Sequence, residues 1–188
     1  MTNMFNQVQQ RSARLALAAL LLSTALGQAH VGEHPSVHDT VAGIIERFRK
    51  TISLKELTAM DAAKAKSLLT QKELQILATE HITFRVNVPV KVIIIRETAM
   101  GDKPFWLKDR GFIPMGFKIT LQGTEVDFWM KDFEVGRIGL GVNSLTGGNS
   151  HYIAALMPLK KETKLEVTEL YPGQLRVGSL KDGLQPFV

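Results

Sequence analysis

The chain has 188 residues, of which 45% are hydrophobic, and it carries no cysteine and a formal net charge of +5 at pH 7. The lack of cysteine excludes disulfides, thiolate metal sites and cysteine nucleophiles, so the core must be held by packing and strand pairing. Lys and Arg alternate with acidic residues along the chain, and such a dispersed, mild excess argues against nucleic acid as a partner.

The first 29 residues have the composition of a secretory signal peptide. Arg11 and Arg14 lie in a segment without acids, an apolar run follows from Leu15 to Leu22, and small residues precede the end at Ala29. A membrane-spanning helix needs roughly 20 apolar residues, and polar residues interrupt this run early. We therefore predict cleavage before His30, export to the periplasm or beyond the cell, and no membrane span in the mature protein.

Helix signals crowd the segment 30–80, which we predict to be an N-terminal helical segment. Ser36 and Asp39 resemble a helix start, and apolar residues then recur at helical spacing, which predicts a helix to about Lys50. The same Ser/Thr-x-x-acid signature returns three times, at Ser53 with Glu56, Thr58 with Asp61, and Thr70 with Glu73. Because each signature marks a new beginning, we expect a cluster of short helices.

From His81 onward the hydrophobic period is that of strands. Ile82, Phe84, Val86 and Val88 alternate with polar residues, and Pro89, which cannot donate to a ladder, predicts a bulge or strand break. The apolar run Val90 to Ile95 predicts a more deeply buried strand. Further runs with strand character are Phe117–Leu121, Glu125–Met130, Arg137–Val142, Tyr152–Leu156, Lys164–Thr168 and Leu175–Val177.

Turn chemistry separates these runs, as at Gln122-Gly123 and Tyr171-Pro172-Gly173. Seven or eight short strands with turns between them favour an antiparallel β-sandwich of the immunoglobulin or fibronectin type III kind over 81–188. The fold class is thus mainly β, with a small helical cluster before the sandwich.

Three histidines, His30, His34 and His38, stand at the predicted mature start. A terminal histidine can hold copper through its amine and imidazole, but such a site needs a remote histidine, for which His81 and His151 are available.

A second metal hypothesis joins His34 and His38 with Glu33 or Asp39, although Pro35 separates the two histidines. The plain alternative, a solvated lead with His38 near a helix start, is favoured because the cluster has no ligand spacing.

No motif of an enzyme is complete. Gly139-x-Gly141 lies in an alternating run and lacks the third glycine of a dinucleotide fold, and Thr146 to Asn149 is typical of a hairpin turn. Neither His-Glu-x-x-His nor Gly-x-Ser-x-Gly occurs. The sequence therefore assigns no catalytic residue, no cofactor and no metal ligand.

Aromatic residues gather in the middle of the β region: Phe105, Trp106, Phe112, Phe117, Phe128, Trp129 and Phe133. A sandwich core explains such a concentration best. The alternative is a cluster open on one side, with Trp106 and Trp129 available to a sugar ring or a partner domain.

The stretch Leu77–Val90, together with Pro104–Leu107, Trp129–Phe133 and Gly139–Asn143, resembles a bacterial family. It is similar to the N-terminal part of exported, calcineurin-like metallophosphoesterases that carry a fibronectin type III or purple-acid-phosphatase-like N-terminal module. The resemblance implies a non-catalytic module whose partner is a metallophosphoesterase catalytic domain.

In that family a following domain holds two metal ions through motifs of the types Gly-Asp-x-x-Tyr and Gly-Asn-His-Asp/Glu. This chain departs from both, with Phe105 in place of Tyr after Gly101-Asp102, and Ser150 in place of His after Gly148-Asn149. No catalytic residue is carried over. A stand-alone binding module for a glycan, surface or protein remains the alternative, followed by an exported metal-binding protein.

Overall fold

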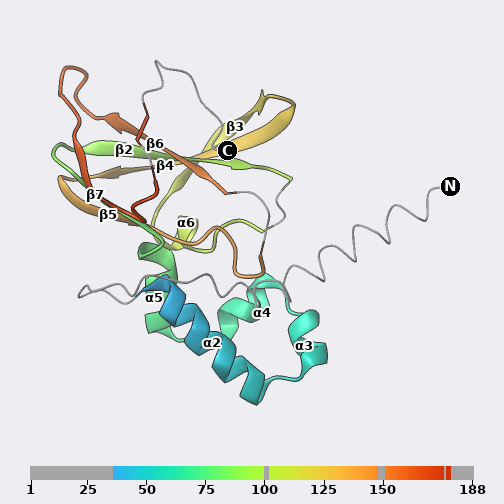
Figure 1. The fold of residues 1–188 in the computed structure, drawn as a ribbon. Coiled ribbons are helices and arrows are strands. Elements are labelled where there is room, and N and C mark those ends of the chain that lie inside the picture. Colours follow the sequence, from blue (N-terminus) through green and yellow to red (C-terminus); the bar gives the residue numbers. More distant parts are fainter. Residues whose placement is uncertain (1–35, 100–101, 148–150, 176, 179–188) are drawn as a thin grey trace.

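The computed structural model describes residues 36–99, 102–147, 151–175 and 177–178, and Figure 1 shows short helices followed by a two-layer arrangement of strands. The predicted signal peptide and two of the clustered histidines, His30 and His34, lie outside these ranges. Among the described residues, no helix is long and apolar enough to cross a membrane.

The helices of the N-terminal part begin at the residues that their capping chemistry selects. They are α2 (Val37–Thr51), α3 (Leu54–Thr58), α4 (Ala62–Ser67) and α5 (Gln71–Thr79). Ser36 caps α2, and the capping boxes at Ser53 and Thr70 are both formed, which confirms three of the four predicted starts. The fourth was wrong: Thr58 ends α3, and Asp61 itself caps α4 by accepting from the Lys64 amide.

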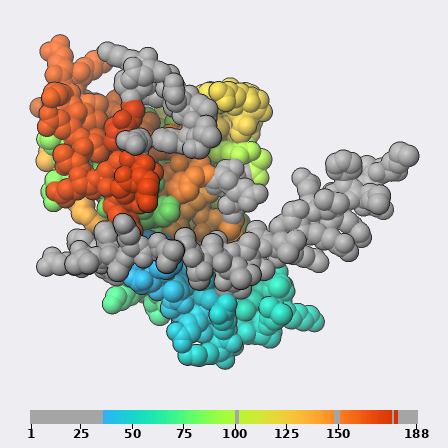
Figure 2. Space-filling view, in the orientation of Figure 1, coloured from blue at the N-terminus to red at the C-terminus, as the bar shows by residue number. Residues whose placement is uncertain are grey.

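One arginine holds the helical cluster together. The Arg47 guanidinium on α2 donates to both carboxylate oxygens of Glu73 on α5, at 2.8 and 2.7 Å, and to the Leu68 carbonyl at 2.9 Å. A bidentate pair fixes both distance and orientation, so α2 is anchored to the first turn of α5. In Figure 1 these helices form a layer below the strands, and in Figure 2 they project from the sandwich.

The strands of the described residues form two antiparallel sheets. They are β1 (Ile82–Val86), β2 (Val90–Glu97), β3 (Ile113–Leu121), β4 (Thr124–Phe133), β5 (Gly136–Leu140), β6 (Ile153–Pro158) and β7 (Val167–Tyr171). We call the three-stranded sheet, in order β5-β1-β7, sheet A, and the four-stranded sheet, in order β3-β4-β2-β6, sheet B. The two sheets pack face to face, which confirms the predicted antiparallel sandwich at the level of architecture.

The connectivity differs from that of an immunoglobulin constant domain. There the first two strands share a sheet, whereas here β1 lies in sheet A and β2 in sheet B. Pro89 lies in the break between β1 and β2, as its missing amide donor predicted, and the chain changes sheets there. The Lys164–Thr168 run becomes strand only from Val167, and neither Leu175 nor Val177 lies in a strand.

The core lies between the two sheets. Sheet A contributes Phe84, Val86, Ile138 and Leu140, and sheet B contributes Val90, Val92, Ile94 and Trp129, all of them buried. The alternation predicted from Ile82 is confirmed for Phe84 and Val86, which point into the sandwich, and for the exposed Arg85, whereas Thr83 on the predicted polar face is buried as well.

A short helix that the sequence did not reveal, α6 (Trp106–Asp109), closes the core next to α5. The Trp106 side chain is completely buried, and its indole Nε1–H donates to the Val142 carbonyl at 2.8 Å. Gly141 allows this contact, because a β-carbon there would lie 2.4 Å from the indole ring. The prediction that Gly139 and Gly141 are strand glycines is confirmed for Gly139 in β5, and Gly141 follows directly after that strand.

Candidate functional site

The outer face of sheet B is an apolar surface that no other part of the described chain covers. We define the B face by its exposed residues Ile113, Phe117, Ile119, Ile153 and Met157, and by the half-buried residues between them: Ile93, Ile95, Phe128, Met130 and Ala155. Strand register places these residues on the same side, because Ile113 pairs with Met130, Met130 with Ile93, and Ile93 with Ala155.

The most exposed part of the B face lies on the edge strand β3. Ile113 is 61% exposed, Phe117 is 49% exposed and Ile119 is 41% exposed. The Phe117 and Phe128 rings lie 5.2 Å apart, so aromatic surface extends from the edge onto β4. Single exposed apolar residues are ordinary, but a contiguous group on one sheet face marks an interaction site.

An ion pair borders the B face at one end, where Lys91 of β2 pairs with Asp132 of β4. Strand register places this pair on the same side of sheet B as Ile93 and Met130. An apolar centre with a polar edge is common in protein–protein interfaces.

Sequence reasoning did not find the B face, although a signal was present. The run Val90–Ile95 predicted a more deeply buried strand, and the inward residues such as Val92 and Ile94 are indeed fully buried. Ile93 and Ile95, on the outer side, are only half-buried. From Val92 onward the run is apolar at every position, whereas a strand with one solvated face normally alternates apolar and polar residues. This lack of alternation was the signal for a partner on the outer face.

The two tryptophans belong to the core. Trp106 is 0% exposed and Trp129 is 2% exposed, and Trp106 contacts the rings of Phe112 and Tyr152 edge-on. The core interpretation of the aromatic concentration is confirmed for both tryptophans. The alternative, in which they stack on a sugar ring, was wrong because neither indole reaches the surface.

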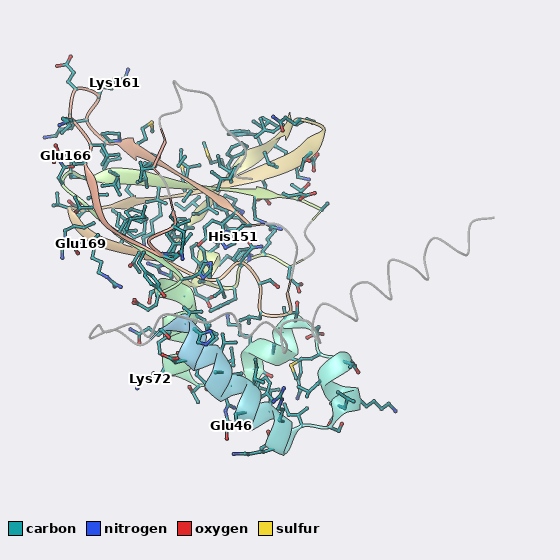
Figure 3. All side chains as sticks on the ribbon, in the orientation of Figure 1. Glu46, Lys72, His151, Lys161, Glu166 and Glu169 are labelled. Atoms are coloured by element: carbon teal, nitrogen blue, oxygen red, sulfur yellow. The ribbon has the colours of Figure 1, made fainter. Side chains whose placement is uncertain are left out.

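Two histidines far apart in the sequence meet at the surface. His81, between α5 and β1, lies with its Nε2 atom 2.8 Å from Nε2 of His151, which lies two residues before β6. The ring centroids are 5.0 Å apart, which is close to the Nε2–Nε2 distance plus the distance from each centroid to its own Nε2 atom. The two imidazoles therefore meet end to end. Figure 3 labels His151 between the strands and the helical layer.

The tautomers of the histidine pair follow from a second contact. Nδ1 of His151 lies 3.2 Å from the Tyr152 carbonyl, so it carries the proton and leaves Nε2 of His151 as an acceptor for His81. Burial, together with repulsion from His151, lowers the pKa of His81 from 6.5 to about 4. His81 is therefore a neutral donor at neutral pH.

The metal hypotheses for the N-terminal histidines and the motif that begins at Gly101-Asp102 concern His38 and Asp102 among the described residues. His38 is exposed on α2, and Asp102 is exposed and accepts from the Thr146 hydroxyl at 3.4 Å. Among the residues that the structure places, no three His, Asp or Glu side chains converge as a multidentate metal site would require.

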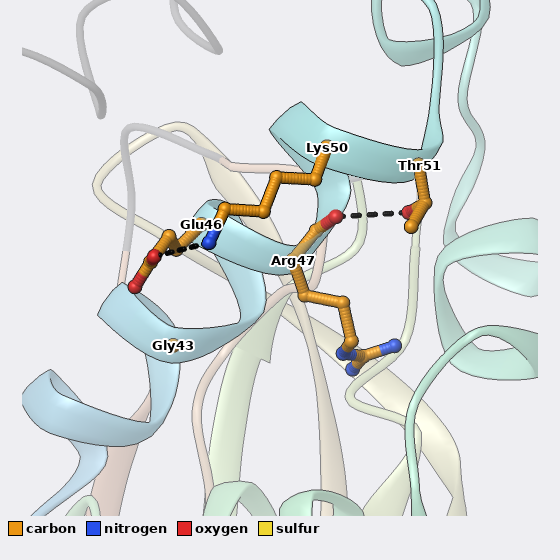
Figure 4. A pocket seen from close by; sticks show the side chains of 5 residues that line it. All are labelled: Gly43, Glu46, Arg47, Lys50 and Thr51. Carbon is orange, nitrogen blue, oxygen red and sulfur yellow. Dashed lines mark hydrogen bonds and ion pairs between the residues drawn. The ribbon is translucent and has the colours of Figure 1, made fainter.

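Two hollows on the surface of the described residues are open and shallow. One lies on α2 and is shown in Figure 4, where Glu46 pairs with Lys50 and the Thr51 hydroxyl donates to the Arg47 carbonyl. These are contacts one helical turn apart, and they leave no group free for chemistry. The second hollow lies between α5 and α6, where Lys66 pairs with Asp109 at 2.7 Å.

Comparison with known proteins returned no matching family model, no matching curated protein and no matching solved structure. The fold and the B face are therefore the observations on which a function can be built.

Proposed function

We propose that this chain is an exported, non-catalytic β-sandwich module that binds a partner protein domain through the B face. The observation that carries the proposal is the contiguous apolar surface of Ile113, Phe117, Ile119, Ile153 and Met157 on sheet B. Leaving such a surface in water is unfavourable by about 25 cal/mol per Å² of apolar area, so a cover is expected.

The partner we propose is the catalytic domain of a metallophosphoesterase, as the resemblance of the sequence implies. In this interpretation the sandwich supports the enzyme, and the metal ligands belong to the partner. The fibronectin-type classification of the module and its export through the leader at residues 1–29 are parts of the same proposal. The burial of Trp106 and Trp129 makes a glycan-binding module the weaker candidate.

The first experiment is to sequence the gene and its neighbourhood beyond the codon for Val188. A reading frame with the two-metal motifs, in frame or nearby, supports the proposal, and that domain is then produced alone. A locus without such a frame overturns the choice of partner and leaves a stand-alone module.

Binding of the two purified proteins is then measured by isothermal titration calorimetry with face variants. Phe117→Ser and Ile113→Lys each remove an anchor from the B face, and we expect losses of about 2 kcal/mol, roughly 30-fold in Kd. Val135→Lys is the matched control, because Val135 is 58% exposed but lies in the turn between β4 and β5, off the face.

Equal affinity of the wild type and both face variants would contradict the proposal. So would concentration-dependent self-association of the isolated chain that Phe117→Ser abolishes, because the occupant would then be a second copy. A separate assay with a chromogenic phosphate ester and divalent metals should show no turnover by the chain alone.

A further inference from the structure

The end-to-end histidine pair has a geometry that a metal ion can use. We propose that His81 and His151 together bind one cuprous ion in a two-coordinate site, in which the ion takes the place of the shared proton. Neither ligand is a B-face residue: His81 directly precedes β1, and His151 lies two residues before β6.

The direction of the two imidazoles selects the coordination number. Their Nε2 atoms point at each other along one line, so an ion between them sees two nitrogens on opposite sides. Zinc in proteins takes four tetrahedral ligands, and no third His, Asp or Glu converges here among the described residues. Imidazole is a good ligand for copper, and the cuprous ion, like zinc, has a filled d shell that imposes no preferred geometry.

The distance requires a small rearrangement. With bonds of about 2.0 Å to each nitrogen, a linear ion needs the Nε2 atoms about 4 Å apart, whereas they are now 2.8 Å apart. His151 is exposed and His81 is half-buried, so rotation of the His151 side chain supplies the difference while His81 stays in place.

The hydrogen bonding of His151 suits a metal. Its Nδ1 atom lies 3.2 Å from the Tyr152 carbonyl and donates to it, a typical outer-shell contact of a metal-bound histidine, which leaves Nε2 to face the ion. When the ion binds, the Nε2 proton of His81 leaves to water, and Nδ1 of the same His81 ring takes up a proton from water. The imidazole remains neutral and no net proton is released.

The test is a titration of the full chain with cuprous ion under a reductant, in competition with a chromophoric cuprous chelator. We expect one equivalent to bind, and X-ray absorption to report two nitrogen neighbours. His81→Gln and His151→Gln should each weaken binding by about tenfold or more, equivalent to about 1.4 kcal/mol.

Two controls make the result specific. The triple variant His30→Gln, His34→Gln, His38→Gln removes the N-terminal histidines and should retain the affinity of the wild type. Circular dichroism establishes that His81→Gln is folded, and should it not fold, the exposed His151→Gln carries the test alone.

Three results would overturn the proposal. They are the absence of bound cuprous ion, binding that the triple variant abolishes, and binding that His151→Gln leaves unchanged.

Discussion

Acid should weaken this protein through His81 in a way that one substitution can isolate. The pKa of His81 is lowered from 6.5 to about 4 by burial and by repulsion from His151. The unfolded chain therefore takes up a proton as the pH falls through 6.5, whereas the folded protein does not until about pH 4. The folded state is fully favoured above pH 6.5 and loses stability progressively between 6.5 and 4.

The size of the effect follows from the difference between the two pKa values. Each unit is worth about 1.4 kcal/mol, so the ceiling is about 3 kcal/mol. The His81 ring is only half-buried, and water screens the repulsion from His151, so we expect about 1 to 2 kcal/mol.

The assay is urea unfolding of the wild type and His81→Gln at pH 7.0, 6.0, 5.0 and 4.5. Glutamine keeps a donor for Nε2 of His151 but does not titrate, and every carboxylate is common to both proteins. The stability of the wild type relative to the variant should fall by about 1 to 2 kcal/mol from pH 7.0 to pH 4.5. If the stability of the wild type relative to the variant stays constant, or rises, as the pH falls, the assignment of a depressed pKa to His81 is refuted.

Three substitutions test the packing, each by thermal or urea unfolding. Gly139→Ala places a β-carbon 1.9 Å from the Thr79 carbonyl, so α5 must move and stability should fall by about 3 kcal/mol or more; a smaller loss would show that the helix yields easily. Trp106→Phe leaves the buried Val142 carbonyl without its donor and should cost about 2 to 4 kcal/mol, whereas a loss below 1 kcal/mol would mean that water replaces the indole. Thr70→Ala removes a helix cap and should cost about 1 kcal/mol, a value that an unchanged midpoint would contradict.

Local chemistry made most of the fold predictable. The helix starts at Ser36, Ser53 and Thr70 depend on side chains three residues apart, and Pro89 breaks a strand because it lacks an amide donor. These rules act within one turn or one strand, so the sequence contains everything they need. The α6 helix has no capping side chain and is held by the burial of Trp106, a tertiary contact that no local pattern reports.

Strand pairing was beyond the reach of local rules. Which strands share a sheet depends on contacts between residues far apart, such as the register that sets Val86 of β1 beside Val167 of β7. The histidine pair has the same origin, because 70 positions separate His81 from His151, and the two meet only when β1 of sheet A and β6 of sheet B are packed together. Sequence reasoning named both histidines as remote ligands without being able to see that they meet.

The B face connects the sequence pattern to function through a single strand. In β2 every second residue is enclosed by the two sheets, whereas the intervening Ile93 and Ile95 are only half-buried by the described chain. Isoleucine is favoured in strands because it is β-branched. On a solvated face threonine has the same β-branch and exposes less apolar area to water, because it carries a hydroxyl. The placement of Ile93 and Ile95, with Phe117 and Ile119 on the same face of sheet B, is accounted for if a partner buries them. Ile95→Thr should then cost the isolated chain at most about 1 kcal/mol and weaken its complex, and a larger loss of stability without a loss of binding would place Ile95 in the core instead.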